Sequence, residues 1–180
     1  MEVLSATPRA HVLDLGGASQ ANIDHIAGAE HRLYAEDALT TLAAAVAKDE
    51  PAASFLRTNL SYPARLFDAV LCWDVLAYAP APYLSPMARR LGEIMKPGGL
   101  ALAYFPNSAA RATTPPGRYT IVGDDVLQRR PAESSSLKEA RFLMRREIDH
   151  VFGELFLITD VVTKDALHEL LLRRRPDEPA

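Results

Sequence analysis

Residues 11–17 read HVLDLGG, and this stretch decides the class of fold for the chain. The run from His11 to Leu15 is short and apolar, which is typical of a buried strand. Gly16 and Gly17 then allow a tight turn, because glycine lacks the Cβ atom that restricts other residues. A buried strand that enters a glycine turn indicates an α/β domain whose ligand lies at the carboxyl end of that strand.

Outward from this turn, helix and strand patterns alternate. The strand patterns after the first lie at 32–35, 53–56, 67–73 and 100–105, and the helix patterns at 22–29, 38–48 and 83–95. The stretch FDAVLCW at 67–73 is continuously apolar, as in a parallel strand covered on both faces. Because alternating strands and helices form a parallel sheet with helices on both sides, we expect a three-layer, Rossmann-like α/β fold with a mostly parallel sheet.

The C-terminal part is expected to complete this sheet. Irregular segments are predicted at 107–118 and 129–135, because both are rich in proline, glycine or serine. The elements expected beyond residue 118 are a strand at 119–122, a helix at 137–152 that starts with a Ser136–Glu139 capping box, and an antiparallel C-terminal hairpin of runs 155–162 and 168–173. We therefore expect a single domain over residues 1–180, with a core at about 11–106 and a C-terminal helix and hairpin at about 119–173.

The composition excludes several classes of protein. The chain has 180 residues, of which 48% are hydrophobic and 24% charged, and its net charge of -3 gives no reason to expect nucleic acid as a partner. The single cysteine, Cys72, and the absence of a signal-like start or a long apolar run predict a cytoplasmic protein without a membrane span. The five histidines are scattered, so no metal site is expected.

Four segments, in their order along the chain, resemble the motifs of class I S-adenosylmethionine-dependent methyltransferases. They are VLDLG at 12–16, LYAED at 33–37, FDAVLCWD at 67–74 and MKPGG at 95–99. The resemblance implies S-adenosylmethionine as cofactor and methyl transfer to an acceptor, a small molecule or another class, that the sequence does not identify. The glycine motif is degenerate, because only Gly16 remains of three glycines, with Ala18 and Gln20 at the other two positions.

The resemblance and the carboxyl-end rule together assign a set of cofactor-binding residues. Glu36 follows the glycine turn by about 20 residues, the usual place of an acid that accepts ribose hydroxyls. Asp37 equally suits the cap of the helix that follows it, and Trp73 equally suits core packing. The amide oxygen of Asn59 suits the adenine amino group in the family's pattern. The assigned residues are Asp14, Gly16, Gly17, Ala18, Glu36, Asp37, Asn59, Leu60 and Trp73.

Asp74 and Tyr78 are assigned as catalytic residues, because they follow the strongest strand on the ligand side. Only about ten residues precede the first strand, where many members of the family carry helices that cover the substrate, so the pocket is expected to be open or completed by an oligomer or partner chain. One alternative is a catalytically inactive, methyltransferase-like binding or regulatory domain. Another is an NAD-binding oxidoreductase, whose G-x-G-x-x-G fingerprint would fall on Gly16, Ala18 and Ala21.

Overall fold

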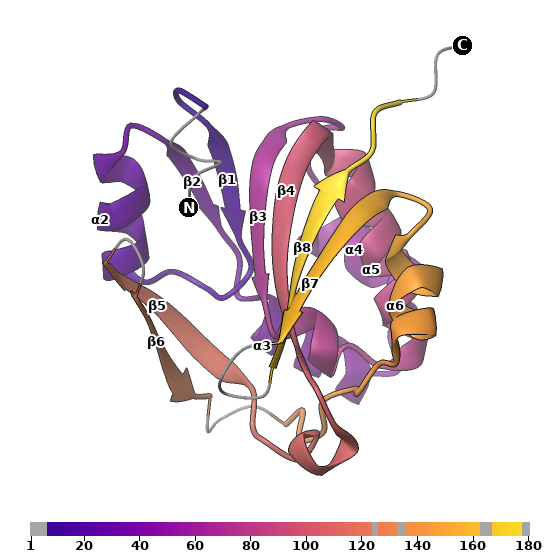
Figure 1. Cartoon of the computed structure of the whole chain (residues 1–180). Coiled ribbons are helices and arrows are strands. Elements are labelled where there is room, and N and C mark those ends of the chain that lie inside the picture. The colour runs from indigo at the N-terminus through magenta and orange to yellow at the C-terminus, as the bar shows by residue number, and fades with distance from the viewer. Residues whose placement is uncertain (1–6, 124–125, 133–135, 163–166, 178–180) are drawn as a thin grey trace.

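The computed structural model describes residues 7–123, 126–132, 136–162 and 167–177, and it shows three layers with a sheet in the middle (Figure 1). The strands are β1 (His11–Asp14), β2 (Arg32–Ala35), β3 (Phe67–Trp73), β4 (Met95–Pro106), β5 (Gly117–Gly123), β6 (Val126–Pro131), β7 (Phe156–Val162) and β8 (Leu167–Arg174). The helices are α2 (Gln20–Gly28), α3 (Ala38–Ala47), α4 (Ala52–Asn59), α5 (Ala81–Ile94) and α6 (Arg145–Phe152), with single 3-10 turns η1 (Val75–Tyr78) and η2 (Ala109–Arg111).

Within the described residues, six strands form the main sheet in the order β2-β1-β3-β4-β8-β7. The first four run parallel, whereas β8 runs antiparallel to β4 and β7 antiparallel to β8. The predicted Rossmann-like fold with an antiparallel C-terminal hairpin is therefore confirmed. Because β1 and β3 are neighbours, the turn after β1 and the loop after β3 meet at one edge of the sheet.

Alternate residues of the central strands enter two separate hydrophobic cores. Leu13 and Cys72 belong to the larger core, with side chains from α3, α4, α5 and α6. Val12 and Trp73 belong to the smaller core, with side chains from α2 and β5. Figure 1 shows the same division, with α2 and the β5–β6 hairpin on one side of the sheet and α4, α5 and α6 on the other.

The predicted strand at 53–56 is wrong, because these residues belong to helix α4. Phe55 is the only fully buried residue of this helix. Its ring makes an edge-on contact with the ring of Tyr83 on α5, with the ring centroids 5.7 Å apart. One buried aromatic among exposed neighbours suits a helix that lies on another helix, whereas a strand inside a sheet would bury alternate positions. The sheet consequently ends at β2.

The predicted helix at 137–152 is wrong in its first half, because α6 begins at Arg145. The main chain before α6 is held by other parts of the fold: Ala140 N–H donates to Ala112 O at 2.7 Å, and Arg141 N–H donates to Ala77 O at 2.6 Å. These bonds replace helical ones, so no capping box forms at Ser136. The helix begins instead where Met144 N–H donates to the Glu147 carboxylate at 2.8 Å.

The β5–β6 hairpin forms a separate two-stranded sheet. Its first strand includes the predicted strand at 119–122, and its second occupies part of the segment expected to be irregular. In the described residues, no helix combines the length and the apolar character that a membrane span requires.

Candidate functional site

The glycine turn and the acid at position 36 lie side by side at the carboxyl edge of the sheet. Glu36 N–H donates to Asp14 O at 2.8 Å, and Gly17 N–H donates to Glu36 O at 2.9 Å. Gly17 has a φ of +89°, a conformation that glycine adopts without strain. The turn is therefore built on the end of β2, and the main chains of these two predicted cofactor-binding segments are in direct contact.

Asp14 is fully buried, and its carboxylate is used inside the protein. Oδ1 accepts from Trp73 Nε1 at 2.6 Å and from Gly16 N–H at 2.8 Å, and Oδ2 accepts from Asn22 Nδ2 at 2.9 Å. Burial raises the pKa of Asp14, although all three hydrogen bonds act to lower it. Asp14 thus joins the end of β1, the end of β3 and helix α2, and its cofactor-binding role stays a prediction.

Trp73 ends β3 and lies directly against the glycine turn. Its φ of +50° lies in the left-handed region, and 1% of its surface is exposed. A Cβ atom at Gly16 would come within 2.6 Å of Trp73 Cδ1. The indole also stacks on Tyr119 of β5, with ring centroids 5.1 Å apart and an angle of 2° between the planes. Glycine at position 16 therefore makes room for this indole.

Arg118, on β5, crosses the outside of the turn. Its Nη1 donates to Gly16 O at 2.6 Å, and its Nη2 donates to Asp37 Oδ2 at 2.7 Å. A Cβ atom at Gly17 would come within 2.8 Å of Nη1. Asp37 is also the N-cap of α3, where it accepts from Thr40 N–H at 3.1 Å. Burial acts to raise the pKa of Asp37, but the bonds from Arg118 and Thr40 outweigh it and lower the pKa.

Glu36 is half-buried on the other side of the turn, and one of its carboxylate oxygens accepts a hydrogen bond from the Tyr62 hydroxyl. Burial first, and then this bond, raise the pKa of Tyr62. Asn59 donates its side-chain amide to Phe55 O at 2.9 Å inside its own helix, and Leu60 is buried in the larger core. Their cofactor-binding roles stay predictions.

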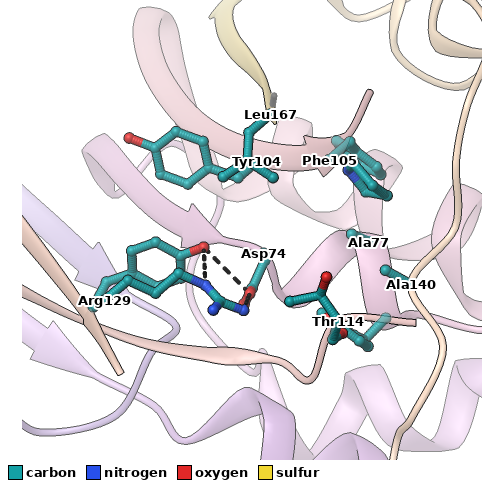
Figure 2. A pocket seen from close by; sticks show the side chains of 11 residues that line it. Asp74, Ala77, Tyr104, Phe105, Thr114, Arg129, Ala140 and Leu167 are labelled. Carbon is teal, nitrogen blue, oxygen red and sulfur yellow. Dashed lines mark hydrogen bonds and ion pairs between the residues drawn. The ribbon is translucent and has the colours of Figure 1, made fainter. Parts of the chain in front are cut away.

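A cavity of about 250 Å³ lies beside the turn, beyond the ends of β3 and β4. Figure 2 shows Asp74 and Arg129 joined on one side of it, with Tyr104 and Phe105 across from them. Its lining comes from η1, β4, the β5–β6 hairpin, three connecting segments and β8. The lining residues are Asp74, Ala77, Tyr78, Tyr104, Phe105, Pro106, Thr114, Tyr119, Arg129, Ala140 and Leu167.

Asp74 is the acid of this cavity, and only 6% of its surface is exposed. Oδ2 accepts from Gly117 N–H at 2.8 Å and from the Tyr119 hydroxyl at 3.3 Å, and it lies 3.7 Å from Arg129 Nη2. Oδ1 is buried without a hydrogen-bond partner among the described residues. Burial raises the pKa of Asp74 to about 6. A buried acceptor without a donor is an unusual feature that a ligand with an O–H or N–H group would satisfy.

Tyr78 lines the same cavity, but its hydroxyl donates to the Thr114 carbonyl. Burial, followed by the charge of Asp74, raises the pKa of Tyr78, so the phenol keeps its proton at neutral pH. Tyr78 is thus suited to holding the connecting segment and poorly suited to acting as a base. Ala18, in contrast, is exposed at the surface of the turn.

The structure thus divides the predicted site residues between two places. Asp74 and Tyr78 share the cavity, whereas the glycines, Glu36 and Asp37 surround the turn, with Trp73 next to both groups. The residues that the sequence did not reveal are Tyr62, Tyr104, Arg118, Tyr119 and Arg129. Most of them lie far along the chain from their partners, and a lone arginine or tyrosine gives no local signal of such a contact.

Comparison with known proteins identifies the class of fold. No family model matches the chain, and no curated protein matches its sequence. Among solved structures, the 1,6-didemethyltoxoflavin-N1-methyltransferase of Burkholderia thailandensis, with 1,6-didemethyltoxoflavin and S-adenosylhomocysteine bound, is similar at a TM-score of 0.52 and 18% identity, over 96% of this chain and 77% of that one. An S-adenosylmethionine-dependent methyltransferase from Aquifex aeolicus is similar at 0.53 and 10% identity, over 96% and 86%.

The chain therefore has the fold of class I S-adenosylmethionine-dependent methyltransferases. The cyclase SpnF is similar at a TM-score of 0.50 and 14% identity, over 97% of this chain and 78% of that one. Proteins of this fold thus include one named for a reaction other than methyl transfer, and the fold alone does not define the chemistry.

Proposed function

We propose that the chain is an S-adenosylmethionine-dependent methyltransferase whose acceptor binds in the Asp74 cavity. The observation that carries the proposal is the buried, unpartnered Oδ1 of Asp74 at the carboxyl edge of the sheet. An acceptor hydroxyl or N–H group in the cavity would donate to this oxygen. The aromatic rings of Tyr104, Phe105 and Tyr119 provide apolar walls that keep water away from such a group.

Asp74 has the proton affinity that this role needs. An acceptor that gains a methyl group through oxygen or nitrogen loses the proton that the atom carried, and Asp74 Oδ1 takes that proton. With a pKa of about 6, the carboxylate is mostly ionised at neutral pH and is a stronger base than an ordinary aspartate. S-adenosylmethionine, when bound, would supply the electrophilic methyl group.

The residues around the turn fit this cofactor at one end only. Glu36 is half-buried next to the turn, and one of its oxygens is engaged by Tyr62, which leaves the other for a ribose hydroxyl. At the turn itself, Trp73 and Arg118 lie where a side chain or a ligand would approach Gly16 and Gly17. Cofactor binding at this end therefore needs side chains to move.

That misfit favours a second candidate function, in which the chain is a methyltransferase-like domain that binds a ligand in the Asp74 cavity without catalysis. In this case Trp73 and Arg118 block the approach to the glycine turn permanently. The two candidates differ in one measurable property, which is the affinity for S-adenosylhomocysteine.

Binding of S-adenosylhomocysteine to the full chain, measured by calorimetry and by thermal unfolding, separates the candidates. For a methyltransferase, ligand at 100 times its dissociation constant should stabilise the chain by about 2.7 kcal/mol. Glu36→Gln should weaken binding by about 1 kcal/mol, the scale of one hydrogen bond from a ribose hydroxyl. Glu154→Gln is the matched control, because Glu154 is exposed near the start of β7, at the opposite edge of the sheet. Absence of binding at millimolar ligand would leave the non-catalytic domain as the function.

A further inference from the structure

We propose that Arg118 is an internal competitor of the cofactor, held over the glycine turn by the β5–β6 hairpin and displaced when the cofactor binds. The inference rests on the proposed function, since it concerns binding of the same cofactor at the glycine turn. The proposal explains how a chain with this fold can hold the Arg118 side chain against its glycine turn. The β5–β6 hairpin then acts as a movable cover over that turn.

The contacts of Arg118 are those that a bound cation makes. Its guanidinium lies between a main-chain carbonyl oxygen, Gly16 O, and a carboxylate oxygen, Asp37 Oδ2, at 2.6 and 2.7 Å. Both acceptors belong to the turn and the acidic segment that are predicted to meet the cofactor. S-adenosylmethionine carries a sulfonium, an ammonium group and a carboxylate, and its ammonium group suits the same two acceptors as the guanidinium. Arg118 and the ligand therefore compete for space and for acceptors.

The attachment of Arg118 is weak enough for displacement. The ion pair with Asp37 is partly exposed, at 37% for the Arg118 side chain and 39% for the Asp37 side chain. Ion pairs with this much solvent contact add little to stability, because water and salt screen them. An arginine side chain also reaches other positions by rotation about its own bonds, without movement of the main chain.

The hairpin that carries Arg118 is docked mainly through side chains. Among the residues that the structure describes, it shares no strand pairing with the main sheet. It is held by Asn22, which donates to Tyr119 O at 3.2 Å and accepts from Ile121 N–H at 2.8 Å, and by the stacking of Tyr119 between Trp73 and Tyr104. The Asp74 carboxylate also holds it, because Oδ2 accepts from Gly117 N–H at 2.8 Å and lies 3.7 Å from Arg129 Nη2. Five of the six β6 residues are exposed. The hairpin can therefore shift without breaking a hydrogen bond of the main sheet.

The test is calorimetric titration of S-adenosylhomocysteine, which keeps the ammonium group and the carboxylate but lacks the sulfonium charge, into the wild-type chain, Arg118→Ala and Arg118→Gln. Arg130→Ala is the matched control, because Arg130 is an exposed arginine of the same hairpin. Removal of the competitor should lower the dissociation constant about threefold to tenfold in both Arg118 variants and leave it unchanged in the control. Trp73 is the only tryptophan of the chain, so its emission verifies that the hairpin stays docked on it in each variant.

Each outcome of the titration either supports or overturns competition between Arg118 and the cofactor. Tighter binding in either Arg118 variant with native Trp73 emission supports competition, including the case in which only the variants bind measurably. Equal or weaker binding than wild type overturns it while the proposed function stands. Absence of binding in the wild type and in both variants overturns competition and the proposed cofactor together, because removing Arg118 would then have opened no cofactor site.

Discussion

The two halves of the carboxyl edge differ in how their polar groups are satisfied. At the glycine turn, Asp14, Gly16 and Asp37 all have partners inside the protein, including the distant Arg118. In the neighbouring cavity, Asp74 keeps one buried oxygen without a partner among the described residues. The polar groups of the turn are thus satisfied by internal contacts, whereas Asp74 Oδ1 in the cavity accepts no hydrogen bond from the described residues.

The largest expected effect comes from Trp73, which belongs to both halves. Trp73→Ala should lower the free energy of unfolding by about 3–5 kcal/mol, because it removes a fully buried ring and one donor to Asp14. Urea denaturation followed by circular dichroism measures this, since the variant has no tryptophan. Trp73→Phe keeps most of the packing and should cost about 1–3 kcal/mol through the lost bond to a buried carboxylate. A loss below 1 kcal/mol in Trp73→Ala would mean that the turn does not depend on the indole.

A smaller effect distinguishes the cavity by its dependence on pH. The pKa of Asp74 is about 6 in the folded protein and 3.8 in its ordinary state, so the folded protein binds this proton more tightly. Its contribution to stability is complete below pH 4 and is lost as the pH rises through 6. Asp74→Asn does not titrate, so its stability relative to wild type should rise by about 2–3 kcal/mol between pH 4 and pH 7.5. Urea denaturation at both pH values gives this difference, and parallel pH profiles would refute a raised pKa.

The smallest effect separates the two roles of Asp37. Asp37→Ala should cost about 1 kcal/mol, because α3 loses its N-cap hydrogen bond. Asp37→Asn keeps a good capping side chain and loses only the partly exposed ion pair with Arg118, so its cost should stay below about 1 kcal/mol. Thermal unfolding of the two variants side by side measures the difference. An equal loss in both would show that the ion pair outweighs the cap.

The sequence predicts well the parts of this fold that local patterns determine. HVLDLGG, FDAVLCW and the closing hairpin are short-range signals of buried strands and turns, and the structure has β1, β3, β7 and β8 there. The strand prediction at 53–56 is wrong because no local pattern marks the helix there, which is stabilised by the contact of Phe55 with Tyr83 on another helix. The start of α6 is also mispredicted from local patterns, since main-chain hydrogen bonds to Ala112 O and Ala77 O replace the expected first helical turns.

In the site, too, local patterns predict the places of residues but not their contacts with distant parts of the chain. Asp14, Trp73 and Asp74 are found from their places at strand ends, but the sequence does not reveal that Trp73 bonds to Asp14. Arg118 and Gly16 are 102 positions apart, and nothing near either residue signals their contact. Access to the turn depends on the side chains of Trp73 and Arg118, which reach it from distant parts of the chain, so it is a tertiary property.

Helix α4, in place of a further strand, also affects how copies of the chain meet. It leaves β2 as one margin of the sheet, with only four residues and an exposed arginine, Arg32. A short, charged margin offers little template for another strand. The opposite margin is β7, which is seven residues long and exposes Leu157 and Val161. Edge-to-edge aggregation of this protein would accordingly start at β7, and a lysine introduced there is the natural protection against it.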